Sequence, residues 1–139
     1  MPIFTRSGPS PKDCWLVDGS PNFGIFPAGL LAQIDAPTSI WLKVGNVAFG
    51  ETHINERHGH WVARQLKTVP QLVFEKLGQP GHIYCTESEK KVKVSLRIAP
   101  SSLLVLELVR ASEVHFSVTS LYAHPAQLDG QVMGRYRGR

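Results

Sequence analysis

Cysteine is scarce in this sequence, and several familiar signatures are absent. The 139 residues include two cysteines, Cys14 and Cys85, which lie far apart and outside any C-x-x-C pair. Two isolated cysteines exclude a disulfide framework and a zinc ribbon. No apolar run approaches the roughly 20 residues that a membrane-spanning helix needs. The N-terminus also lacks the charged start and apolar segment of a signal peptide, so we expect no membrane partner.

The histidines lack the spacing of a common zinc site. His53, His58 and His60 are close in sequence, but the helical H-E-x-x-H arrangement is absent and no cysteine lies nearby. The sequence does not identify a carboxylate that would complete a metal site either. We therefore expect no metal and no cofactor. A metal-dependent hydrolase that uses this cluster is a third hypothesis, and it predicts stoichiometric zinc on purification.

The composition fits one basic globular domain. A hydrophobic fraction of 42% over 139 residues is enough for one core. We expect a Pro/Gly-rich lead-in over residues 1–37, only partly ordered, and a single α+β domain over 38–139. The net charge of +4 and the pI near 9.3 make a polyanion such as nucleic acid a candidate partner.

Two helices are predicted in the middle of the chain. The first has Thr52 as its N-cap and runs to about Gln65, with a bend near Gly59. The second is capped by Thr68 and ended by Gly78, and its apolar stripe belongs to the core.

Beyond the second helix the hydrophobic pattern changes to a period of two. Four strands are expected, at residues 82–86, 91–98, 103–110 and 114–122. The turn-like segments between them favour an antiparallel meander. Helices followed by strands predict an α+β fold in which N-terminal helices pack on a four-stranded antiparallel sheet.

The same alternation separates an apolar face of this sheet from a polar one. Apolar residues such as Val94, Leu96 and Val118 should cover the helices. The opposite face carries Lys93, Ser95, Arg97, His115, Ser117 and Thr119. Such a basic, hydroxyl-bearing face would suit a phosphate backbone. An ordinary solvent-exposed face explains the lysines equally well, whereas we interpret Arg97, near the sheet centre, as functional.

Metal-free RNA cleavage needs a base, an acid, positive charge for the phosphoryl oxygens and a means of positioning the nucleotide. The chain offers candidates for each role. His53 and His58 are the acid and base candidates, because imidazole titrates near neutral pH. Substrate binding is assigned to Arg57, Lys93, Arg97, His115 and Ser117, and hydrogen bonding at the end of the last strand to Thr119, Ser120 and Tyr122. His60, His82 and His124 are interpreted as structural.

Several of these motifs occur together in one known group of nucleases. The run H-I-N-E-R-H-G at 53–59, the helix at 69–77, the Q-P-G-H-I entry at 79–83 and the V-T-S-L-Y strand at 118–122 follow in order. This order resembles the barnase/EndoU/colicin/RelE-type (BECR) ribonuclease superfamily, in its phage-associated and polymorphic-toxin branches. The resemblance covers residues 45–124 and leaves the first forty or so unmatched.

The resemblance implies a BECR-like fold and a metal-independent endoribonuclease that leaves 2′,3′-cyclic phosphate ends. It further implies a toxin domain acting on tRNA or rRNA in the cytoplasm, delivered as part of a larger toxin or phage protein and restrained by an immunity protein or antitoxin. Roles for His53, His58, Thr119, Ser120 and Tyr122 follow from their positions in the matched motifs. The alternative is a non-catalytic RNA- or protein-binding module, such as an antitoxin or phage accessory protein, that uses the same basic face.

Overall fold

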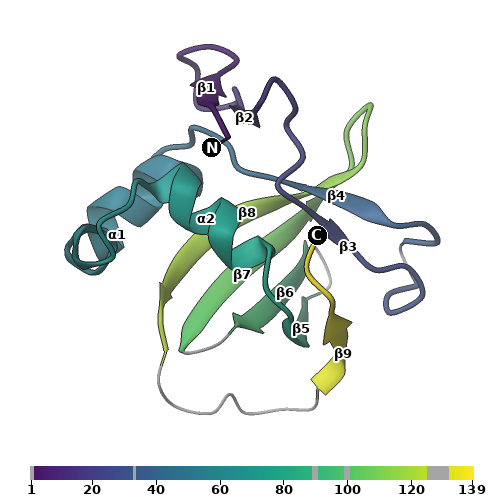
Figure 1. Ribbon diagram of the computed structural model, residues 1–139. Coiled ribbons are helices and arrows are strands. Elements are labelled where there is room, and N and C mark those ends of the chain that lie inside the picture. Colours follow the sequence, from purple (N-terminus) through teal and green to yellow (C-terminus); the bar gives the residue numbers. More distant parts are fainter. Residues whose placement is uncertain (1, 33, 89–90, 99–100, 125–131) are drawn as a thin grey trace.

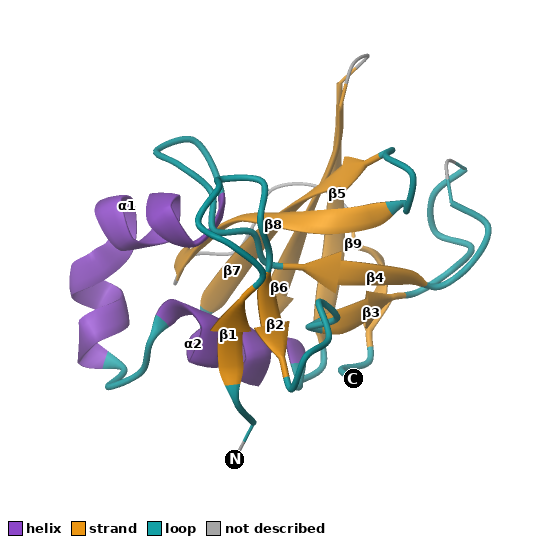
Figure 2. Cartoon of the chain, turned by 90° about the horizontal axis from the view of Figure 1, so that it is seen from above, coloured by secondary structure: helices purple, strands orange, loops and turns teal. Residues whose placement is uncertain are grey.

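The computed structural model describes residues 2–32, 34–88, 91–98, 101–124 and 132–139, without the side chains of 85–88 and 91. Within this part the chain forms nine strands and two helices (Figures 1 and 2). The strands are β1 (Phe4–Arg6), β2 (Trp15–Val17), β3 (Gly24–Phe26), β4 (Thr38–Trp41), β5 (Gly81–Ser88), β6 (Lys91–Ile98), β7 (Ser102–Val109), β8 (His115–Ala123) and β9 (Val132–Tyr136). The helices are α1 (Gly50–Arg64) and α2 (Val69–Leu77), and neither is long and apolar enough to span a membrane.

Seven of the strands form one mixed sheet in the order β3-β4-β8-β7-β6-β5-β9, and β1 pairs with β2 separately. Within this sheet β4 runs parallel to β8, and the other neighbours are antiparallel. The prediction of a four-stranded antiparallel sheet was therefore wrong. The expected meander forms β5 to β8 at the centre of a wider sheet. Two of the additional strands, β3 and β9, have three and five residues, which is too short for a period of two to be recognised.

The predicted position of the helices was also wrong. Both helices lie between β4 and β5 in the chain, after strands that the N-terminal segment supplies. α2 covers one face of the sheet and α1 lies beside β8 (Figures 1 and 2). The N-terminal segment also enters the core, because Phe23 and Phe26 are fully buried there.

The core lies between α2 and the apolar face of the sheet. Leu72, Val73 and Leu77 of α2 are at most 1% exposed. They belong to one cluster with inward-facing residues of the central strands: Val94, Leu96, Ile98, Leu104, Leu106, Phe116, Val118 and Leu121. Burying a side chain of this size contributes about 1.5–3 kcal/mol, so this face fixes the sheet on α2.

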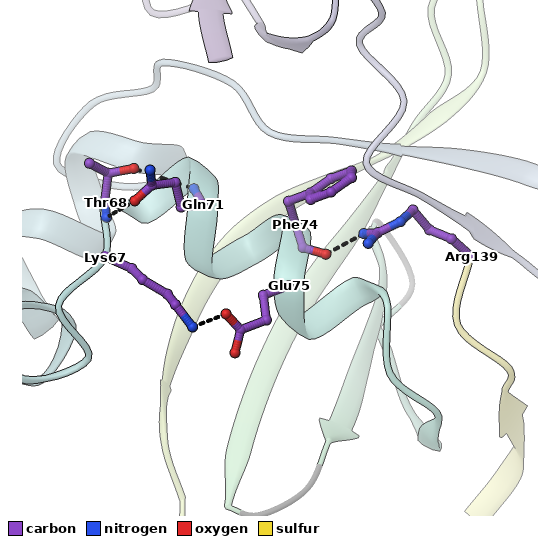
Figure 3. Close-up of polar contacts among 6 residues, drawn as sticks. All are labelled: Lys67, Thr68, Gln71, Phe74, Glu75 and Arg139. Carbon is purple, nitrogen blue, oxygen red and sulfur yellow. Dashed lines mark hydrogen bonds and ion pairs between the residues drawn. The ribbon is translucent and has the colours of Figure 1, made fainter. Parts of the chain in front are cut away.

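The ends of α2 are held by side chains from several parts of the chain (Figure 3). Thr68 and Gln71 form a capping box, in which the Thr68 hydroxyl accepts from the Gln71 backbone N–H and the Gln71 side chain accepts from that of Thr68. Lys67 forms an ion pair with Glu75. At the other end Arg139 donates to the Phe74 carbonyl, which ties the C-terminal residue to the helix.

Candidate functional site

A tight connection from β4 positions the start of α1. Gly45 and Gly50 have positive φ angles of 72° and 78°, which glycine adopts without steric cost. Glu51 N and Thr52 N then donate to backbone carbonyls that follow β4, at 3.0 Å each. α1 therefore begins at Gly50, and Thr52 is not its N-cap, because the Thr52 hydroxyl donates to Val44 O at 2.9 Å. This connection fixes where His53 projects.

His53 has one ring nitrogen committed to the backbone. Its Nδ1 lies 2.8 Å from Val47 O. Because a carbonyl only accepts, Nδ1 carries the proton and donates. Nε2 is then the nitrogen that can take up or release a proton in exchange with a substrate. His53 is thus oriented in the way that acid–base catalysis requires.

Four rings form a chain that starts at His53. The His53 and His58 ring centroids are 6.1 Å apart in an edge-to-face arrangement. His58 stacks on Tyr122 of β8 with a centroid separation of 4.9 Å, and Tyr122 lies 6.1 Å from His124. We call these residues the ring chain. His124 was interpreted from the sequence as structural, yet it lies at the end of this group.

α1 departs from helical geometry at His58, which has φ −131° and ψ 18°. The bend expected near Gly59 therefore begins one residue earlier. Burial lowers the pKa of His58, and the nearby His53 and Arg57 lower it further. The neutral form of His58 therefore predominates at pH 7, which leaves a lone pair available for a proton.

A polar cavity of about 420 Å³ lies between the start of α1 and the sheet. Its volume falls within the range usual for small-molecule sites. We call it the polar cavity, and its lining residues are Lys43, Ala48, Phe49, His53, Lys93, Glu107, Val109, Ser117, Thr119 and Ser120. The structure thus brings five sequence-derived candidates together: His53, Lys93, Ser117, Thr119 and Ser120.

A β-bulge explains how β8 can supply three polar residues, Ser117, Thr119 and Ser120, to this cavity. Val105 pairs with Ser120 and Leu106 pairs with Val118, so Thr119 is an extra residue on β8. Its hydroxyl donates to Val105 O at 3.0 Å. Simple alternation would place Ser117 and Ser120 on opposite faces of the sheet. With the extra residue, both line the polar cavity.

Ser117 and Ser120 are buried without a hydrogen-bond partner. Their side chains belong to residues that are only 4% and 8% exposed, and among the described residues neither hydroxyl is satisfied. A buried hydroxyl without a partner is costly, typically by about 1–3 kcal/mol. Such groups in a native fold call for an explanation, and a ligand that reaches them from the cavity would supply one.

Lys43 and Glu107 complete the charge of the cavity, and neither was predicted from the sequence as a site residue. Lys93, Glu107 and Ser117 lie directly across from one another on adjacent strands. Burial lowers the pKa of Lys43, while Cys14 and Glu107 raise it in part. Glu107 could have been found from its alternate position in the predicted strand at 103–110. The place of Lys43 beside the cavity could not be found in this way, because it depends on the parallel pairing of β4 with β8.

The remaining candidates do not line the polar cavity. Arg57 is exposed on α1 next to His58, and Arg97 pairs in register with Leu103, which in turn pairs with Tyr122. His115 is 3% exposed and stacks on Trp41 with a centroid separation of 3.8 Å. Burial lowers the pKa of His115, although its Nδ1 bond to Glu113 O opposes the shift. In this position His115 serves packing.

Two larger cavities lie elsewhere. One of about 630 Å³ lies between the β1–β2 hairpin and the two helices, and one of about 520 Å³ borders α2 and Arg139. Neither includes a histidine among its described lining residues. The described part of the chain also contains no group of three His, Cys, Asp or Glu side chains that could hold a metal ion.

The chain was compared with protein-family models, with curated proteins and with solved structures. None of them matches this chain. Function must therefore be argued from the geometry of the polar cavity and the ring chain.

Proposed function

We propose that the chain is a metal-independent endoribonuclease whose active site is the polar cavity together with His58 and Tyr122. One observation carries the proposal. His53 lies both in a cavity with two lysines and three hydroxyl side chains and 6.1 Å from a second imidazole. This provides an acid, a base, positive charge and hydrogen-bond donors at one place, as cleavage by the ribose 2′-hydroxyl requires.

The charge of the cavity supports an internal phosphodiester as the substrate. Lys43 and Lys93 contribute two positive charges and Glu107 one negative charge, and His53 adds a third positive charge when it is protonated to act as the acid. The net positive charge of the cavity attracts the negative charge of a phosphodiester.

The roles of the two histidines follow from their surroundings. His58 is the base, because its lowered pKa keeps it neutral at pH 7. It takes the 2′-hydroxyl proton while the 2′-oxygen attacks phosphorus. His53, oriented by Val47 O, donates a proton from Nε2 to the departing 5′-oxygen. The products are a 2′,3′-cyclic phosphate and a 5′-hydroxyl, and the lysines stabilise the pentacoordinate phosphate between these steps.

Tyr122 holds the His58 ring by stacking, and Ser117 and Ser120 present hydroxyls to the bound nucleotide. Thr119 can only accept there, because its hydroxyl donates to Val105 O. The proposal includes a toxin role in the cytoplasm. Expression of the chain in a bacterium should then arrest growth, and His53→Ala should relieve the arrest. An immunity protein or antitoxin would be the natural partner of such an enzyme.

The decisive test is incubation of the purified chain with RNA in EDTA, followed by analysis of the product ends. Cyclic phosphate ends that disappear in His53→Ala support the proposal. His60→Ala is the matched control, because His60 is exposed on the same helix and does not line the cavity. Salt-sensitive RNA binding without any product would overturn it in favour of a non-catalytic RNA-binding module.

A further inference from the structure

We propose that the polar cavity selects the nucleobase on the 5′ side of the cut, accepting bases with an exocyclic amino group and disfavouring uracil. This deepens the proposed function and rests on it in taking RNA as the substrate. The starting point is the pair of buried hydroxyls on β8. Ser117 and Ser120 find no partner among the described residues, although both line the cavity. Each can donate and accept, so a ligand that satisfies them must present a polar edge.

The cavity also has apolar walls. Phe49, at the start of α1, and Val109, at the end of β7, both line it. A phosphate gains no binding energy from contact with apolar side chains. A nucleobase does, because it combines a flat apolar body with a hydrogen-bonding edge and stacks on aromatic side chains. We therefore assign the phosphodiester to His53 and the lysines, and the base to Phe49 and the two serines.

Glu107 decides which base fits. It lies in register with Ser117 on the neighbouring strand, so the carboxylate and the hydroxyl face the same part of the cavity. A carboxylate offers only acceptors. It accepts well from the exocyclic amino groups of adenine, cytosine and guanine. Uracil has no amino group, and carbonyl oxygens flank its single ring N–H, so a carboxylate repels that edge.

The test uses four DNA oligonucleotides, each with a single ribonucleotide, rA, rC, rG or rU, at the same position. Attack by a 2′-hydroxyl can occur only at that ribonucleotide, which fixes the base being compared. We expect kcat/KM for rU to be about tenfold or more below the other three, as the loss of one good base contact implies. Equal kcat/KM for all four would overturn the inference while leaving the proposed function intact.

Variants connect this preference to the named residues. Glu107→Gln adds a donor, so it should reduce the discrimination against rU. The double variant Ser117→Ala/Ser120→Ala should lower cleavage at all four ribonucleotides, because a hydroxyl can donate to or accept from any base. Ser95→Ala is the matched control, because Ser95 lies in the neighbouring strand β6 and does not line the cavity. Unchanged discrimination in Glu107→Gln, or unchanged cleavage in the double serine variant, would contradict the assignment, with thermal melts confirming that each variant is folded.

A binding measurement separates this inference from the proposed function. If no oligonucleotide is cut, the ribonuclease proposal fails, and titration with 3′-AMP, 3′-CMP, 3′-GMP and 3′-UMP followed by NMR then tests the cavity alone. Weaker binding of 3′-UMP than of the other three would support the base preference. Equal binding, or binding of inorganic phosphate with the same affinity, would refute it.

Discussion

Replacing Ser120 by alanine should make the protein more stable and less active. The Ser120 hydroxyl is buried and unpartnered within the described part of the chain, so the folded state bears its desolvation cost and the unfolded state does not. Alanine keeps the backbone and removes the polar atom. We take the lower end of the range for the cost of an unsatisfied buried hydroxyl, and therefore expect the free energy of unfolding to rise by about 1 kcal/mol. For a chain of this length, that raises Tm by about 4 °C.

Urea denaturation followed by circular dichroism measures the stability, and cleavage of RNA in EDTA measures the activity. The urea concentration at the unfolding midpoint should rise, while the slope of the free energy of unfolding against urea concentration stays unchanged. An unchanged slope separates a gain in stability from a change in the unfolded state. Ser117→Ala should behave in the same way. The two gains need not add, because both residues line one cavity. A fall in stability for both variants, or cleavage at the wild-type rate, would refute the reasoning that a ligand satisfies these hydroxyls.

Two further predictions concern the groups around the cavity. The acidic limb of the pH profile of kcat/KM should report the pKa of His58, so activity should rise with pH through a value below 6.5. Arg57→Gln should move this limb to higher pH, because it removes one cause of the lowered pKa. Arg64→Gln is the control, and an acidic limb that does not move in Arg57→Gln would count against His58 as the base. Gly45→Ala should destabilise the fold by about 2 kcal/mol or more, since a Cβ there meets a positive φ and collides with Phe49 O, and cleavage should fall with the displaced start of α1. Gly29→Ala has a similar φ but an open surrounding, so its smaller loss isolates the collision.

The central strands could be predicted from the sequence because their alternation is long. β6 matches the expected range of 91–98, and β5, β7 and β8 differ from theirs by one or two residues at each end. β3 and β9 could not, since three and five residues carry too little pattern. The place of β4 in the sheet depends on tertiary pairing, above all on the parallel contact of Ile40 with Phe116.

The candidate site was predictable in part for the same reason. Alternation places Lys93 and Ser117 on one face, and the cavity contains both. Alternation does not place Ser120 on this face, because a one-residue bulge cannot be recognised in a pattern with a period of two. It also fails for His115, whose polar character gave no sign that Trp41 would cover its ring.

The proposed ribonuclease activity is tested most directly by the products of RNA incubated with the purified chain in EDTA. We predict cleavage that leaves 2′,3′-cyclic phosphate and 5′-hydroxyl ends, lost in His53→Ala and retained in His60→Ala. Intact RNA with the wild-type chain, or equal cleavage by His53→Ala, would contradict it.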